Sequence, residues 1–383
     1  MASVFEKNLT KFSAIPDEAK RADYNSNDHV GTVTALRSMG NWSGGLANTE
    51  HSICDAYCSL IKNSKSHVYM ENQFFCTTVS TGESTRGNMD VENRIGEEIC
   101  NRIIKAHENG ENFKMYCVIP LLPEGAGDIF QMRDGFATTR TIMHYQYAGF
   151  RSDPPKKECV DFADLENRVT GSTIFTKLVS KGINPDDYIY FGGLRKYEIL
   201  PNKQFQTEVI YVHSKLLIVD DKYTVIGSAN CNDRSQLGDR DSEVCLLFES
   251  EDYATTLRHQ LWSTFLGIDK LQVAEHNPTS LEMWIKFKNT AKSNTEVFDK
   301  VFMKPPMNKL NSYEVLETFR AEYDANQESL NDKANFDGTK VELEKISGVL
   351  VDYPLDFLKD EWFPPSTLPV TAPESLAPPK TFV

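Results

Sequence analysis

The sequence predicts an α/β fold in which helices flank a central sheet, continued by a helical C-terminal segment. Stretches with apolar side chains every three or four residues alternate with short apolar, β-branched runs between residues 31 and 270. The chain has 383 residues, of which 40% are hydrophobic and 11% aromatic, enough for a substantial core. We therefore expect an N-terminal extension over residues 1–30, an α/β domain over 31–270, and helices with a tail over 271–383.

Each element of the α/β domain is predicted from its own pattern. Helical periodicity covers four stretches: Ser52–Asn63, Glu92–Glu108, Ile174–Ser180 and Glu251–Gly267. Strand-like runs cover five: His67–Phe75, Met115–Ile119, Tyr188–Phe191, Val209–Val219 and Thr224–Ile226. The polar, proline-containing stretch between Phe150 and Val169 is predicted to be a surface insertion.

The C-terminal segment differs in composition from the α/β domain. Its periodic stretches predict three helices, followed by a polar loop: Leu281–Ala291, Thr295–Val301, Tyr313–Glu328, and the loop Gln327–Thr339. The last 20 residues contain six prolines, which is typical of an extended tail.

Charge and composition narrow the classes of function. The formal net charge is −14 and the sequence pI is near 5.1. A nucleic-acid partner normally requires a basic face, so we expect none. The first residues lack the apolar core of a signal peptide, and no window approaches 18 consecutive apolar residues. With eight scattered cysteines, these features lead us to expect a cytoplasmic protein with reduced thiols.

The most informative stretch runs from residue 211 to 243. It contains His213-Ser214-Lys215, then Asp220, then Gly-Ser-Ala-Asn at 227–230. Because side chains alternate along a strand, a strand over Val209–Val219 would turn His213 and Lys215 to one side. Asp220 has the opposite parity and falls where that strand ends. The next strand ends in the Gly-Ser-Ala-Asn segment, so the strand pair brings these polar groups near one place.

This set of side chains suits a phosphodiester. Lys215 supplies positive charge to non-bridging oxygens, and Ser228 and Asn230 supply neutral donors. His213 is suited to act as nucleophile or as acid and base near neutral pH. Glu243 is the candidate to bind the other imidazole nitrogen and fix its tautomer. Asp220 is expected to be structural, ending the strand and pairing with a local cation.

The pattern H-x-K-x4-D followed by G-S-x-N resembles the phospholipase D superfamily signature. The flanking words Ile-Val-Asp-Asp at 218–221 and Asn-Asp-Arg-Ser at 232–235 resemble the eukaryotic, phosphatidylcholine-hydrolysing branch, and more closely the second of its two motif copies. The resemblance implies a fold that is one half of a pseudo-symmetric, two-domain enzyme. By the motif, it implies a catalytic set and a substrate-binding pair: His213, Lys215, Asp220 and Glu243, with Ser228 and Asn230. The word Glu-Asn-Gln-Phe-Phe at 71–75 resembles a family segment near the site, which adds Gln73.

In the resembling family, one histidine attacks phosphorus to give a phosphohistidine and the other protonates the leaving group. His213 resembles the second of these, which implies hydrolysis of phosphatidylcholine to phosphatidate and choline, with transfer to alcohols as a side reaction. We expect no metal and no other cofactor, because no cluster of His, Asp and Glu has ligand spacing.

A second copy of the motif is missing. None of the other histidines has a lysine two residues further on. Three hypotheses follow: a half-site completed by a first-half partner or by a homodimer at a membrane surface, a non-catalytic relative that binds phosphate or lipid headgroups, or a fragment of a longer phospholipase D. A nuclease is disfavoured by the acidic charge. An apolar patch beside the site would favour a partner, whereas a polar surface there would favour the binding protein.

Overall fold

The computed structural model describes residues 31–77, 79, 91–123, 128–133, 136, 139–140, 142–143, 146, 173–330 and 333–361. The stretches 1–30 and 150–169 and the proline-rich tail, for which expectations were stated above, lie outside the described residues.

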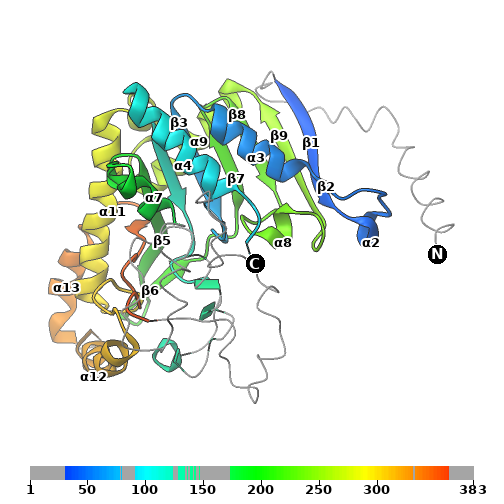
Figure 1. Ribbon diagram of the computed structural model, residues 1–383. Coiled ribbons are helices and arrows are strands. Elements are labelled where there is room, and N and C mark those ends of the chain that lie inside the picture. Colours follow the sequence, from blue (N-terminus) through cyan, green and yellow to red (C-terminus); the bar gives the residue numbers. More distant parts are fainter. Residues whose placement is uncertain are drawn as a thin grey trace, which may run out of the picture.

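Ten strands of the described chain form one mixed sheet (Figure 1). Their order is β10-β5-β4-β3-β7-β8-β9-β1-β2, and β6 pairs with the far part of β5. The pairs β3–β4 and β4–β5 are parallel, and the other described pairs are antiparallel. The strands are β1 Thr32–Met39, β2 Glu50–His51, β3 His67–Asn72, β4 Lys114–Val118, β5 Ile189–Ile199, β6 Phe205–Ile210, β7 Lys215–Val219, β8 Tyr223–Gly227, β9 Glu243–Glu249 and β10 Leu350–Asp352.

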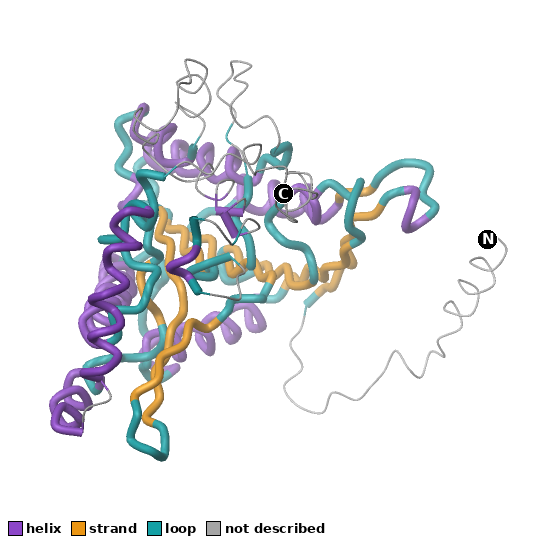
Figure 2. Tube along the Cα trace, turned by 90° about the horizontal axis from the view of Figure 1, so that it is seen from below, coloured by secondary structure: helices purple, strands orange, loops and turns teal. Residues whose placement is uncertain are grey.

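Helices cover both faces of this sheet, as the view from below shows (Figure 2). On one face lie α3 Ser52–Asn63, α4 Ile95–Asn109 and α7 Ile174–Ser180, and on the other lie α9 Glu251–Leu266, α10 Lys270–Ala274 and α11 Leu281–Val301. Other α-helices whose bounds the structure describes are α2 Asn41–Gly44, α8 Asp233–Gln236, α12 Tyr313–Leu330 and α13 Phe336–Leu343. Short 3₁₀ turns lie at Ile129–Gln131, Pro185–Asp187 and Lys333–Asn335.

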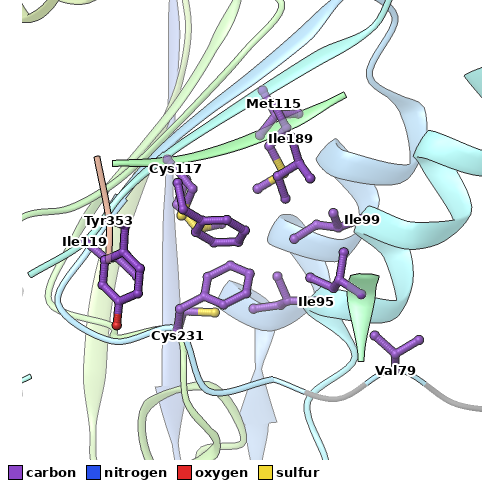
Figure 3. Close-up of a cluster of buried hydrophobic side chains, with 14 of the residues drawn as sticks. Val79, Ile95, Ile99, Met115, Cys117, Ile119, Ile189, Cys231 and Tyr353 are labelled. Atoms are coloured by element: carbon purple, nitrogen blue, oxygen red, sulfur yellow. The ribbon is translucent and has the colours of Figure 1, made fainter. Parts of the chain in front are cut away.

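Each face of the sheet has its own apolar core. Alternate side chains of β3, β4, β5 and β7 pack against α3, α4 and α7. Figure 3 shows part of this core, in which Met115, Cys117 and Ile189 from the sheet lie beside Ile95 and Ile99 of α4. On the opposite face, rings of Tyr116, Trp262, Trp284 and Phe287 pack against one another with centroids 4.6–5.1 Å apart. A strand buried on both faces reads as a continuous apolar run, which explains why the central strands could be recognised.

The predicted α/β class is confirmed, and helices Ser52–Asn63 and Ile174–Ser180 agree with their predicted bounds. The two helices expected between 281 and 301 are one helix, α11. The loop expected over Gln327–Thr339 is wrong, because α12 continues to Leu330 and α13 begins at Phe336. In the C-terminal segment, α11 packs on the sheet and β10 pairs with β5. The domain boundary expected at residue 270 stays a prediction.

The strand expected over Val209–Val219 is also wrong. The run is divided between β6, which pairs with β5, and β7, which lies between β3 and β8. Residues 211–214 form a loop between them. The apolar pattern continues across the division because both halves lie in the sheet, so the pattern hides the change of partner.

The ends of several adjacent strands lie on the same side of the sheet, where the strands enter or leave it. Asn72 at the end of β3 is paired with Lys215 at the start of β7, and Gly227 at the end of β8 is paired with Cys245 near the start of β9. These strand ends therefore bring together four parts of the chain: residues 71–73, 213–215, 227–230 and 243. Among the described helices, none is long and apolar enough to cross a bilayer.

Candidate active site

Lys215 is the buried first residue of β7. Its ammonium donates to Gln73 Oε1 at 2.8 Å and to the His213 carbonyl oxygen at 2.7 Å. Burial lowers the pKa of Lys215 below its ordinary value, and the negative charge of nearby Glu243 opposes this shift. The predicted members Lys215, Gln73 and Glu243 are thus brought together.

His213 lies in the loop between β6 and β7, with an exposed side chain. The Tyr211 ring is its aromatic neighbour, at 6.4 Å between centroids. Within the described part of the chain, no hydrogen bond or ion pair reaches the imidazole. The imidazole is therefore open to substrate or to a partner.

The contact expected between Glu243 and His213 does not form among the described residues. The buried Glu243 carboxylate instead accepts hydrogen bonds from the hydroxyls of Ser228 and Ser235, the latter at 2.7 Å. The physical reason is that Glu243 begins β9, which pairs with the strand that leads into Ser228. Ser235 was not predicted, although it lies in the Asn-Asp-Arg-Ser word that was singled out.

Ser228 and Asn230 follow β8 and differ in their surroundings. Ser228 is exposed, donates to Glu243 and accepts from the Val244 amide at 3.2 Å. Asn230 is half-buried, and its Oδ1 atom is buried with no hydrogen-bond partner in the described chain. The next residue, Cys231, turns into the core, as Figure 3 shows, and so anchors the segment.

Asp220 lies apart from the other predicted residues. It follows Val219, at the end of β7 opposite Lys215, and five strand residues correspond to roughly 15 Å. Its carboxylate accepts from the backbone amides of Lys65, Ser66 and His67 at 2.7–3.1 Å. Asp220 therefore ends the strand, as expected, but touches none of the other site residues.

A local cation was expected to pair with Asp220, but the nearby cation, Arg258, binds the next residue, Asp221. Asp221 accepts from both Nε and Nη2 of Arg258 on α9, at 2.7 and 2.6 Å, and contacts His67 Nε2 at 3.2 Å. Within the described residues, no group of three or more His, Cys, Asp or Glu side chains is arranged to hold a metal ion.

Comparison with known proteins supports one family. A family model for phospholipase D matches residues 24–153 and 192–343. Phospholipase D from Phytophthora infestans is 35% identical over 356 residues, covering 88% of this chain and 18% of that protein. Phospholipase D1 from Homo sapiens is 36% identical over 354 residues, covering 87% of this chain and 30% of that protein. The chain therefore belongs to the phospholipase D family.

Solved structures similar to the chain include Nuc from Salmonella typhimurium, a phospholipase D family member, and NucT from Helicobacter pylori. Nuc is 13% identical with a TM-score of 0.26 and covers 60% of this chain and 91% of its own. NucT is 12% identical with a TM-score of 0.29 and covers 59% and 92%. The chain spans only 18% of the length of the phospholipase D from Phytophthora infestans and 35% of that of phospholipase D2 from Bos taurus.

Proposed function

We propose that the chain provides one half of a phospholipase D-type phosphodiesterase site that hydrolyses phosphatidylcholine. One observation carries this proposal: Lys215, Glu243 and Ser228 lie together beside the exposed imidazole of His213. Lys215 has three N–H donors, of which two bind oxygen atoms of the protein. The third is left for a non-bridging phosphate oxygen.

In this proposal, a histidine from a second motif attacks phosphorus and forms a P–N bond. The P–O bond to choline breaks, and His213 gives its proton to the departing oxygen. Water then loses a proton to His213 and attacks the phosphohistidine, which releases phosphatidate and restores both histidines. With ethanol in place of water the product is phosphatidylethanol. Lys215 stabilises the negative charge on phosphate throughout.

The sheet surface beside the site supports a partner. On one side of β8, β9 and β1, four apolar residues are exposed: Val33 by 57%, Val244 by 55%, Leu246 by 38% and Ile226 by 37%. Leu246 is paired with Ile226, and Val244 and Leu246 alternate with the buried Cys245. We propose that a first-half phospholipase D domain or a second copy of this chain covers this apolar sheet surface and supplies the second motif.

A phospholipid substrate remains in the bilayer during the reaction, so the proposal implies peripheral contact with a membrane. A cytoplasmic location remains the expectation from the sequence. A headgroup-binding protein without turnover is the second hypothesis, and a fragment whose longer parent is the enzyme is the third. Phosphatidylethanol formation separates the enzyme from the binding protein.

The test is phosphatidylethanol formation from phosphatidylcholine vesicles and ethanol by the purified chain, together with its mass in solution. A dimer that forms product supports a self-sufficient enzyme, and His213→Ala should abolish product while leaving the unfolding transition cooperative. A silent chain that becomes active when a first-half domain is added supports the half-site. Binding to vesicles without product under either condition would sink the enzyme proposal and leave the binding protein.

Turnover should persist in a chelator such as EDTA, because Lys215 and the uncharged donors supply the charge stabilisation that a metal would give. The comparison is product formation with EDTA and with added Mg²⁺ or Ca²⁺, using substrate in detergent micelles to avoid effects of the cations on vesicles. A strict need for added divalent metal would contradict this part of the proposal.

A further inference from the structure

Three consecutive residues at the end of β3 each bind a different part of the site. Glu71, Asn72 and Gln73 are all buried, with at most 7% of the surface of each residue exposed. Two belong to the last part of β3, and Gln73 follows it. They lie beside the loop of residues 211–214, which leads into β7, the strand paired with β3.

Glu71 binds the residue between the two catalytic candidates. Its carboxylate accepts a hydrogen bond from Ser214 Oγ on one side and from the Tyr69 hydroxyl on the other. Ser214 joins His213 to Lys215 in the chain. Burial raises the pKa of Glu71, while the bonds from Ser214 and Tyr69 oppose the shift. A buried carboxylate bound in this way restrains the loop that carries His213.

Asn72 binds the backbone directly after the Gly-Ser-Ala-Asn segment at 227–230. Its Oδ1 atom accepts from the Cys231 amide at 2.9 Å and from the Phe74 amide at 3.3 Å. The Cys231 carbonyl in turn accepts from the Cys76 amide at 2.8 Å. These bonds fix the backbone directly after Asn230.

Gln73 binds two residues that flank His213 in the sequence, Tyr211 and Lys215. Its Oε1 atom accepts from Lys215 Nζ at 2.8 Å, and its Nε2 atom donates to the Tyr211 hydroxyl at 3.1 Å. Tyr211 is the ring neighbour of His213. Gln73 was expected to bind substrate; its amide binds Lys215 and Tyr211, and the substrate contact stays a prediction.

We propose that Glu71, Asn72 and Gln73 form a positioning segment, in which Glu71 sets the orientation of His213 through Ser214 without touching the substrate. The imidazole has no hydrogen bond of its own in the described chain, so its loop must hold it. Nothing in the sequence motif itself marks Glu71 for this role, because it lies 143 residues from Ser214. The proposal deepens the proposed function and rests on it for its kinetic consequence.

The kinetic test compares Glu71→Gln, Ser214→Ala and the double variant with the wild type, in whichever assembly is active. A misplacement of about 1 Å costs on the order of 10²-fold in rate, so we expect kcat to fall by about that factor with KM nearly unchanged. Ser214→Ala removes the donor of this contact, and Glu71→Gln replaces one of its two acceptor oxygens by an amide nitrogen that cannot accept. Because both changes act on the same contact, the double variant should be no slower than the slower single variant. Tyr69→Phe is the matched control, because it removes the other donor to the same carboxylate and leaves the Ser214 contact.

A second readout does not depend on turnover. In protein labelled with ¹³C-histidine, the His213 ring signal is assigned with His213→Gln and followed by NMR. We expect Glu71→Gln and Ser214→Ala to broaden or split this signal, and Tyr69→Phe to leave it sharp. If the signal changes but no variant or wild type turns over lipid, the positioning role stands and the enzyme proposal fails.

Two results would overturn the inference. One is an unchanged His213 signal and unchanged kcat in Ser214→Ala, a variant that removes only a hydroxyl and keeps Glu71 in place. The other is an equal change in kcat for Tyr69→Phe and Glu71→Gln, which would make the carboxylate a general stabiliser of β3 instead of a positioning residue for His213.

Discussion

Lys215 shows how one side chain combines two tasks. Two of its three donors bind Gln73 and the His213 carbonyl, which fix the ammonium, and one is left toward the site. An ammonium fits this position because it is a compact charge with three donors. A guanidinium is planar and wider, with a fixed fork of donors, so it does not reproduce the same two bonds.

We therefore expect Lys215→Arg to be a poor replacement although the positive charge is kept. Product formation should fall by at least about 10²-fold, comparable to the loss of one preorganised donor in other enzymes. The assay is phosphatidylethanol formation, with circular dichroism to confirm the fold. Substantial activity in this variant would show that charge alone, without the two fixing bonds, is sufficient.

At this scale the sequence predicted several residues of the site, but it did not predict the partners of Glu243 or the distance of Asp220 from Lys215. Short spacings within and between adjacent strands predicted His213, Lys215, Ser228 and Asn230 near one place, and Glu243 was expected there as the partner of the imidazole. The sequence did not predict that Glu243 binds Ser235, since that contact depends on the turn of α8. Contacts of this kind follow from tertiary geometry that spacing does not encode.

At the scale of elements, the turn between β7 and β8 is bound to both of its neighbours. Asp220 and Asp221 both have positive φ, at 56° and 51°, a conformation that aspartate tolerates better than most residues. Asp220 accepts from the amides that lead into β3, and Asp221 binds Arg258 on α9. The carboxylates hold the turn between a strand and a helix.

Asp221→Asn should destabilise the fold by about 3–5 kcal/mol, because it leaves the buried guanidinium of Arg258 without its counter-charge. Only 2% of the Arg258 side chain is exposed, so water cannot replace the lost partner. Urea unfolding measures the difference, and Asp239→Asn, at an exposed position, is the control. A loss as small as that of the control would show that the pair contributes little.

The same pair should make stability depend on pH at the acid side. Burial alone would raise the pKa of Asp221, but hydrogen bonds and charge from His67 and Arg258 hold it well below its ordinary value. An unfolded aspartate has a pKa near about 3.9, so the stabilisation is fully present above that value and is lost as pH falls toward the folded pKa. The gap in unfolding free energy between wild type and Asp221→Asn should therefore narrow below pH 4; a constant gap down to pH 2 would contradict this assignment.

Elements were predicted best where the periodicity is local. The helix Ser52–Asn63 has its own amphipathic pattern, so its bounds needed no knowledge of its neighbours. The strand over Val209–Val219 failed for the opposite reason, because a strand buried between others carries no sign of which strand it joins. The loop that bears His213 is the product of that hidden change of partner.

For the whole molecule, the apolar sheet surface on β8, β9 and β1 makes a prediction about assembly. Val244→Lys should weaken association and abolish turnover by the assembled enzyme, because burying an unpaired ammonium against a partner is costly. Leu271→Lys on α10 is the control, since Leu271 is 74% exposed and lies on another element. Sedimentation and phosphatidylethanol formation report the outcome, and a Val244→Lys variant with normal mass and activity would place the partner elsewhere.

The bonds from residues 71–73 to the motif also determine when the site can form. Glu71 and Ser214 are 143 positions apart in the chain, Gln73 and Lys215 are 142 apart, and Asn72 and Cys231 are 159 apart. Closing such long loops has an entropic cost that local contacts do not repay, so pairings of this kind form late in folding. During synthesis the segment 71–73 leaves the ribosome well before its partners exist. The segment 71–73 can therefore bind the motif only once β7 has joined β3.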